Sequence, residues 1–196
     1  MRKKRDRVVD LPTVEQIQQE RQRMRYQRRY SRTLKSTIAV LVVVAAAAIL
    51  VATLWMPVFQ IYGTSMSPTL EEGQYVVAVK SDSFETGDVC ALWYGNKLLV
   101  KRVIAGPGSW VNIDKDGNIF VDGSLIDEPY LTEKAFGDCN IELPIQVPDS
   151  KWFVMGDNRA TSADSRNSSV GCISDEYIVG RIEFCVWPLS KFGPIN

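Results

Sequence analysis

The chain has 196 residues, enough for one moderate domain and an appendage, and its 23 basic and 23 acidic side chains give a formal net charge of zero. It contains no histidine, which excludes Ser-His-Asp and Cys-His catalytic arrangements and most catalytic zinc sites. The zero net charge hides an asymmetry, because residues 1–35 carry a net charge of +8 and the remaining residues carry −8. Such a split predicts that the two parts of the chain occupy different environments.

Residues 1–36 form a basic tail, and an apolar stretch of twenty residues follows it. The sequence "TIAVLVVVAAAAILVATLWM" (Thr37–Met56) has no charged residue. Twenty helical residues at about 1.5 Å each span about 30 Å, the thickness of the hydrocarbon core of a bilayer. We therefore expect a transmembrane helix over residues 37–57. A cleaved signal peptide would have a shorter apolar core behind a shorter basic segment, and one small domain could hardly bury a helix that is apolar on all sides.

The basic tail predicts the orientation of this helix. Lys and Arg collect in cytoplasmic loops, so we expect a single-pass protein of the cell (cytoplasmic) membrane with its N-terminus inside and residues 58–196 outside. Contact with membrane lipid explains the basic charges more simply than a nucleic-acid arm, so no nucleic-acid partner is expected. Within the tail, Thr13–Tyr30 is rich in helix formers and poor in apolar residues, which leaves open a solvated or membrane-surface helix and a partly disordered segment.

From Pro57 onward the sequence changes to short runs rich in Val, Ile and aromatic residues, separated by turn signals. These runs predict a mainly β fold, an antiparallel β-barrel or sandwich, over residues 58–196. Residues 132–150 are the least regular part and are expected to form a long loop or insertion. The predicted strands are Gln74–Lys80, Asp88–Tyr94, Lys97–Ala105, Trp110–Asp114, Asn118–Gly123, Lys151–Gly156 and Ile178–Pro188.

Four cysteines are widely spaced, without a CxxC pair. Cys90 and Cys185 lie inside apolar strand-like runs and are expected to be core residues. An exported domain could form disulfides, but whether Cys139, Cys172 or the other two pair cannot be read from the sequence.

Two residues are candidates for serine chemistry without histidine. Ser65 lies in "GTSMSPTL", among small residues, and a nucleophilic serine here would need a base such as lysine. Lys101 lies in the apolar strand "LLVKRVIA", where burial would disfavour its ammonium form and lower its pKa. Strand alternation predicts that Lys101 and Arg102 point to opposite faces, so that one can be buried while the other is solvated or paired. Taken singly, each has a plainer interpretation, Ser65 as a turn serine and Lys101 as an edge-strand lysine that discourages aggregation.

The polar segment "GDNRATSADSR" (Gly156–Arg166) completes a pattern. Taken in order, the basic tail, the apolar span, "GTSMSPTL", "LLVKRVIAGPG" and "GDNRATSADSR…GRIEFCVWP" resemble bacterial type I signal peptidases, in the layout of the single-span, Gram-positive members. The resemblance covers nearly the whole chain from residue 37. The sequence departs from the family's usual "LPGD" after the lysine strand, where it has "GPGS", and it has Ala160 and Thr161 where relatives often have polar residues.

The resemblance implies roles for particular residues. Ser65 matches the nucleophile, Lys101 the general base, and Ser162 a serine that orients the lysine amine. The backbone N–H of Ser65 would donate to the oxyanion, in the region of Gly63, which lacks the hydroxyl that some relatives offer there. The segment that supports the site would comprise Asp157, Asn158, Arg159 and a structural ion pair of Asp164 with Arg166.

The resemblance further implies a membrane-anchored serine endopeptidase that removes signal peptides from secretory preproteins, with no metal and no cofactor. The substrate would bind as an extended strand, with Met66, Leu70 and Leu99 lining shallow apolar pockets for the small residues of an A-x-A pattern. Eight residues between the span and Ser65 reach at most about 29 Å, which suits cleavage near the membrane. The alternatives are a non-catalytic, membrane-tethered β module and a relative of self-cleaving repressors, which would carry a DNA-binding motif. The oligomeric state cannot be read from the sequence.

Overall fold

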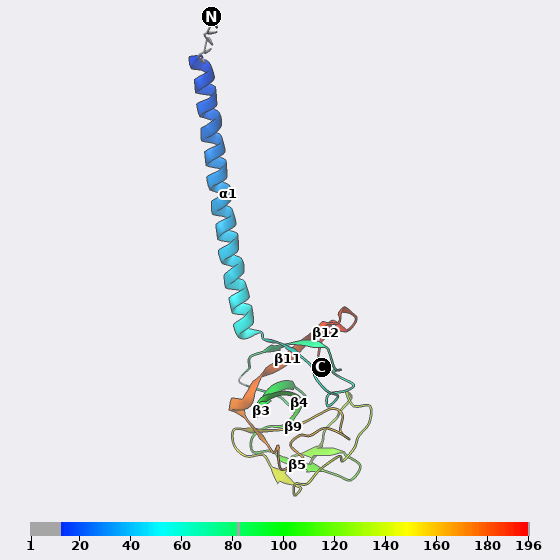
Figure 1. Cartoon of the computed structure of the whole chain (residues 1–196). Helices are drawn as coiled ribbons and strands as arrows, with labels where there is room; N and C mark the ends of the chain where they lie inside the picture. The colour runs from blue at the N-terminus through cyan, green and yellow to red at the C-terminus, as the bar shows by residue number, and fades with distance from the viewer. Residues whose placement is uncertain (1–12, 82, 196) are drawn as a thin grey trace, which may run out of the picture. The chain divides into compact units, whose positions relative to one another are not determined.

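The computed structural model describes residues 13–81 and 83–195 (Figure 1). By its internal contacts, the chain divides into two compact units, with the boundary between Leu50 and Val51. The described residues of the first unit belong to one helix, and the second unit contains the last residues of that helix and the β-strands. We call residues 58–195 the β domain.

Helix α1 (Val14–Trp55) is 42 residues long. Its length follows from the sequence, because residues 13–56 contain neither glycine nor proline, and Pro12 and Pro57 bracket them. Thr13 and Gln16 form a capping box at its start: the N–H of Gln16 donates to Thr13 Oγ1 at 3.4 Å, and the N–H of Thr13 donates to Gln16 Oε1 at 3.0 Å. The helix is long and apolar enough to cross a membrane.

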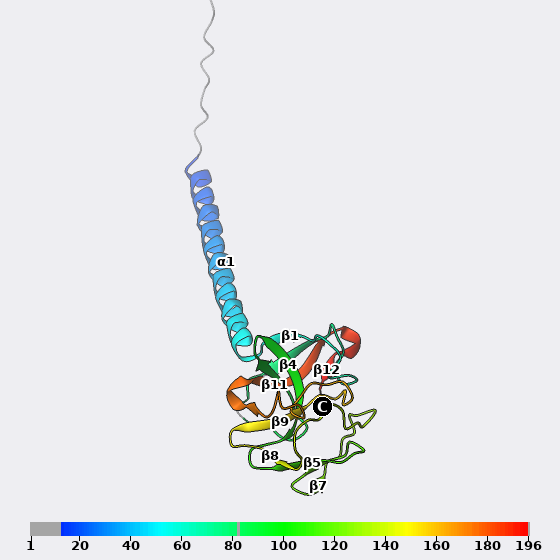
Figure 2. The same cartoon turned by 60° about the horizontal axis from the view of Figure 1, so that its bottom comes forward.

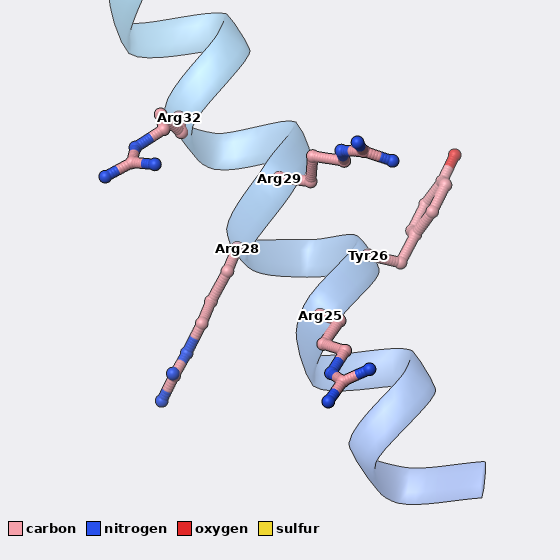
Figure 3. A pocket seen from close by; sticks show the side chains of 5 residues that line it. All are labelled: Arg25, Tyr26, Arg28, Arg29 and Arg32. Atoms are coloured by element: carbon pink, nitrogen blue, oxygen red, sulfur yellow. The ribbon is translucent and has the colours of Figure 1, made fainter.

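One continuous helix contains both the basic and the apolar stretch, which agrees with one of the two alternatives left open for Thr13–Tyr30, a helix leading into the span. The basic stretch over Thr13–Tyr30, for which a surface helix or a partly disordered segment was expected, runs without a break into the apolar stretch. Figure 3 shows Arg28 and Arg32 on one side of this helix and Arg29 with Tyr26 on another. The first twelve residues of the expected tail lie outside the described residues.

The β domain contains two antiparallel sheets, which agrees with the predicted mainly β class. The larger sheet has the order β1-β2-β11-β3-β4-β9-β10, with β12 paired to β11, and the smaller has the order β7-β6-β5-β8. Figures 1 and 2 show the smaller sheet at one end of the domain and β12 at the other. The strands are β1 (Val58–Gln60), β2 (Tyr75–Val79), β3 (Val89–Tyr94), β4 (Lys97–Ala105), β5 (Trp110–Ile113), β6 (Ile119–Val121), β7 (Ser124–Leu125), β8 (Ile145–Gln146), β9 (Lys151–Met155), β10 (Ile173–Ser174), β11 (Ile178–Trp187) and β12 (Gly193–Pro194).

All seven predicted strands are present, within one or two residues at each end. The five strands that the sequence did not indicate are β1, β7, β8, β10 and β12, each of two or three residues, too short to show a periodic pattern. Two single-turn 3-10 helices, η1 (Asp175–Tyr177) and η2 (Leu189–Lys191), flank β11. Residues 132–150, which were expected to form a long loop or insertion, contain a single short strand, β8. The chain between β7 and β8 has neither helix nor strand, and we call this segment, residues 126–144, the long loop.

The core of the β domain consists of three apolar clusters. One joins β2, β3 and β11 with the turn after β1, a second lies between β4, β9 and the smaller sheet, and a third comprises residues of β3, β4, β9 and β10. Cys90 and Cys185 are buried in this core, as predicted, and all four cysteines are free thiols. Burial raises the pKa of the Cys90 thiol to about 12, which makes it unreactive.

Candidate active site

Ser65 lies in a tight turn between β1 and β2. Met66 and Leu70 are spaced one helical turn apart, and the N–H of Leu70 donates to the carbonyl of Met66 at 2.9 Å, so both apolar side chains are buried in the core. Ser65 itself stays half-buried at the surface of this turn. The Ser65 carbonyl accepts a hydrogen bond from the N–H of Asn158 at 3.0 Å, which fastens the turn to the segment after β9.

Lys101 is buried in the middle of β4, with 3% of its surface exposed. Its Nζ donates a hydrogen bond to Ser162 Oγ at 2.8 Å, which fixes the end of an otherwise flexible side chain. Burial lowers the pKa of Lys101 below its ordinary value of 10.5. The charges of Asp164 and Asp157 act in the opposite direction, and that of Arg166 acts with burial. An amine in this position loses its proton more easily than a solvated lysine and can then accept one.

Asp164 and Arg166 form a buried ion pair that anchors the segment carrying Ser162. The guanidinium of Arg166 donates from Nε to one oxygen of Asp164 and from Nη2 to the other, both at 2.9 Å, and neither side chain is exposed. Burial acts to raise the pKa of Asp164, but the hydrogen bonds and charge of Arg166, with bonds from Gly156 and Ser162, hold it below 3.8. Because Asp164 is fixed by Arg166, its hydrogen bond with Ser162 fixes that hydroxyl, which in turn holds the amine of Lys101.

Arg102, the neighbour of Lys101, points to the other face of β4, as the alternation predicted. Its guanidinium makes a two-pronged ion pair with Asp157, at 2.9 Å and 2.7 Å. Asp157 also accepts a hydrogen bond from the hydroxyl of Thr69 at 2.5 Å. Arg102 thereby joins β4 both to the segment after β9 and to the turn that contains Ser65.

Gly156 is the point where these parts meet. A Cβ atom at this position would collide with Ser162 Oγ and with the carbonyl oxygen of Ser65. Both serines therefore pack directly against the Gly156 backbone, whose N–H donates to Asp164 at 3.0 Å. Only glycine allows the serine turn and the lysine-holding serine to approach the same backbone so closely.

A groove of about 660 Å³ runs past Ser65, between β1 and the first half of β4. Ser65, Met66 and Leu99 line it, together with Val58–Gly63 and the remaining residues of Lys97–Val100. Leu70, which we expected in a substrate pocket, lies instead in the core, with 1% of its surface exposed.

Arg159 has a partner that the sequence did not indicate. We expected it near the Asp164 pair, but it forms its own ion pair with Glu128 of the long loop, at 2.5 Å. Tyr130 is the second residue that sequence reasoning missed, and its ring covers the guanidinium of Arg102 at 3.7 Å. No pattern in the segment "IDEPYL" pointed to a buried carboxylate, because the ion-pair partner of Glu128, Arg159, lies 31 residues away in the chain.

The geometry suits serine hydrolysis without histidine: a half-buried serine on a groove, and a buried lysine held by a second serine. Comparison with known proteins agrees with this class. Residues 34–187 match the family described as signal peptidase, peptidase S26. The chain therefore belongs to the signal peptidase, peptidase S26 family.

Signal peptidases of known sequence or structure are among the proteins that are similar to the chain. It is 34% identical over 169 residues to signal peptidase I of Bacillus licheniformis, which covers 78% of this chain and 88% of that protein. It is 35% identical over 156 residues to signal peptidase IB of Staphylococcus aureus (strain COL), covering 68% and 79%. A crystal structure of a signal peptidase I from Enterococcus faecalis V583 aligns with a TM-score of 0.44 at 23% identity, covering 50% of this chain and 96% of that one, a likeness too weak to bear on the fold.

Proposed function

We propose that this signal peptidase, a serine endopeptidase, removes signal peptides from secretory preproteins with Ser65 as nucleophile and Lys101 as general base. The observation that carries the proposal is the buried amine of Lys101, held at 2.8 Å by Ser162, in a strand that borders the groove of Ser65. The alternative of a non-catalytic β module finds no support in the family assignment.

The reaction proceeds through an acyl-enzyme. Neutral Lys101 takes the proton of Ser65 as Oγ attacks the scissile carbonyl, and the backbone N–H of Ser65 donates to the oxyanion in the region of Gly63. Lys101 then gives that proton to the leaving amine, the peptide bond breaks, and an ester to Ser65 remains. A water molecule, deprotonated by Lys101, hydrolyses the ester and restores the serine. Ser162 keeps the amine aligned in both steps.

The groove suits an extended substrate strand. β4 pairs with β3 along Lys97–Arg102, but β9 pairs with it only from Arg102 onward, so in the described chain no strand covers the other edge of Lys97–Lys101. A preprotein segment can hydrogen-bond to that free edge, facing β1 across the groove. Met66 and Leu99 would contact the small side chains before the cut.

The apolar helix and the family assignment together indicate a membrane-anchored protein. The finer topology is part of the proposal: the basic end of α1 lies in the cytoplasm, next to anionic lipid, and the β domain lies outside the cell membrane.

Cleavage of one model preprotein by the full-length chain in detergent tests the two roles. We expect Ser65→Ala and Lys101→Ala each to abolish cleavage, by at least about 10³-fold, because each removes a partner of the covalent step. Ser169→Ala, at an exposed serine in a loop, is the matched control and should cleave normally. Near-normal cleavage by either site variant, with a folded domain, would refute the proposed chemistry.

A further inference from the structure

Glu128 is a buried carboxylate that the catalytic scheme above does not use. It lies in the long loop, and its side chain has no exposed surface. It accepts hydrogen bonds from both terminal nitrogens of Arg159, at 2.5 Å and 3.3 Å, and from the hydroxyl of Tyr130 at 2.9 Å. Its neighbour Asp127 is exposed to solvent.

One chain of contacts runs from Glu128 to the site through Arg159. Nε of Arg159 donates to the carbonyl of Gly156 at 3.1 Å. Gly156 is the residue against which Ser162 Oγ and the Ser65 carbonyl pack. A shift of the Arg159 guanidinium would therefore move the Gly156 backbone, against which both serines pack.

A second chain of contacts runs through Tyr130. Its ring lies over the guanidinium of Arg102 at 3.7 Å, and Arg102 holds Asp157. Asp157 in turn accepts the hydroxyl hydrogen bond of Thr69, in the turn of Ser65. Both contact chains start at Glu128; the first ends at the backbone of Gly156 and the second at the turn of Ser65.

We infer that Glu128 is a positioning residue for the reaction: through Arg159 and Tyr130 it sets the placement of Ser162 and Ser65 around the amine of Lys101. This inference rests on the proposed function and adds to it a residue from the long loop. The physical reason is that a buried guanidinium without its carboxylate reorganises to find another partner. A displacement of reacting groups by about 1 Å can cost about 100-fold in rate.

The test compares Glu128→Gln with Asp127→Asn in the full-length chain in detergent. Both substitutions remove one carboxylate charge from adjacent residues, but only the first removes the carboxylate that pairs with Arg159 and leaves a single amide oxygen as acceptor. We expect Glu128→Gln to lower kcat by about 10- to 100-fold with little change in KM, since the groove is built by other elements. Asp127→Asn should match the wild type.

The pH profile separates positioning from a simple charge effect. The charged groups that act on Lys101 are Asp164, Asp157 and Arg166. If Glu128→Gln makes Lys101 less buried, the pKa of Lys101 rises, and the rising limb of the kcat/KM profile moves to higher pH. Loss of a negative charge alone would move the limb to lower pH. A limb that moves down or stays in place, or a normal kcat, would overturn the inference.

Tyr130→Phe keeps the inference testable if Glu128→Gln does not fold. It removes only the hydroxyl donor to Glu128 and leaves the ring over Arg102. We expect kcat to fall by about 2- to 10-fold, with the same direction of change in the pH profile. An unchanged kcat in this variant would count against the inference. If instead Ser65→Ala or Lys101→Ala retained cleavage, the proposed function itself would fail, which is a distinguishable result.

Discussion

Lys101 and Arg102 are neighbours on β4, and burial has opposite consequences for their charges. Arginine cannot give up its proton inside a protein, so a buried Arg102 requires a carboxylate, which Asp157 supplies at 2.7 Å. Lysine can lose its proton, and Lys101 has a neutral hydroxyl, not a carboxylate, as its hydrogen-bond partner. The same strand thus holds one permanent cation for structure and one amine that is available as a base.

The lowered pKa of Lys101 predicts how activity depends on pH. Only the neutral amine can accept the proton of Ser65, so kcat/KM rises with pH through the pKa of Lys101. Because burial lowers this pKa, half-maximal kcat/KM is expected below pH 10.5, the ordinary value for lysine. A profile of kcat/KM against pH measures it, and a midpoint at or above 10.5 would contradict the prediction.

The same shift predicts a cost in stability. Between the folded pKa and 10.5 the unfolded chain binds more protons than the folded one, so stability rises with pH in that window. Below the window the full cost is present. Lys101→Met removes it while filling similar space, so the midpoint of thermal unfolding near pH 7 should rise, by about 2–4 °C for each kcal/mol regained. The gain should vanish above pH 10.5; a gain that is independent of pH would show that packing, and not charge, is responsible.

At the scale of elements, the long loop contacts Arg159 and Arg166 of the segment that carries Ser162. Arg166 donates to the carbonyl of Phe136 at 2.8 Å, and the Gly137 backbone packs against Arg159 and Arg166. An irregular segment therefore holds two of the three buried ion pairs that support the site. The side-chain pairs Arg159–Glu128 and Arg166–Asp164 both depend on its position.

Gly137→Ala tests the contact of the long loop with Arg159 and Arg166, and Gly171→Ala is the matched control. Both glycines have left-handed backbones, with φ of 67° and 61°, so alanine is strained by about 1–2 kcal/mol at either position. At Gly171 a Cβ meets open space, whereas at Gly137 it would collide with the carbonyl of Arg159 and with Arg166. We expect Gly137→Ala to lose about 1–3 kcal/mol more stability, and to cleave more slowly. Tryptophan fluorescence during denaturation measures the free energy of unfolding of both variants. Equal losses would show that the long loop accommodates the added Cβ without loss of stability.

These elements differ in how far the sequence determines them. Lys97–Ala105 was predicted as a strand with its observed bounds because nine residues of β-forming sequence stand between two turn signals. The Asp164–Arg166 pair could be predicted from the sequence, because its members are two residues apart. The burial of Glu128 could not, because no local pattern distinguishes a carboxylate that pairs with a residue 31 positions away. Leu70 was misplaced because a pocket and a core residue look alike when only hydrophobicity is known.

At the scale of the whole molecule, charge is divided between the two units of the chain. The described part of α1 before the apolar stretch contains seven basic residues and only two acidic ones, and the β domain is acidic overall. This distribution matches a protein that keeps its basic end against a cytoplasmic, anionic membrane surface and sends its acidic end outward. Helix α1 adds a structural reason: one continuous helix joins the basic and apolar stretches, so no hinge separates them.

The topology can be tested in cells by adding protease from outside. With the N-terminus inside, protease added to cells stripped of their wall should digest the β domain and leave the basic segment of α1 protected. Replacing the seven basic residues with glutamine (Arg21, Arg23, Arg25, Arg28, Arg29, Arg32 and Lys35) should make part of the population insert the other way, because Lys and Arg near the span set orientation. Replacing Glu15 and Glu20 with glutamine is the matched control and should change nothing, since acidic residues contribute little to the rule. A β domain that resists external protease in the wild type, but is digested once the membrane is opened, would reverse the proposed orientation and with it the access of the groove to exported substrates.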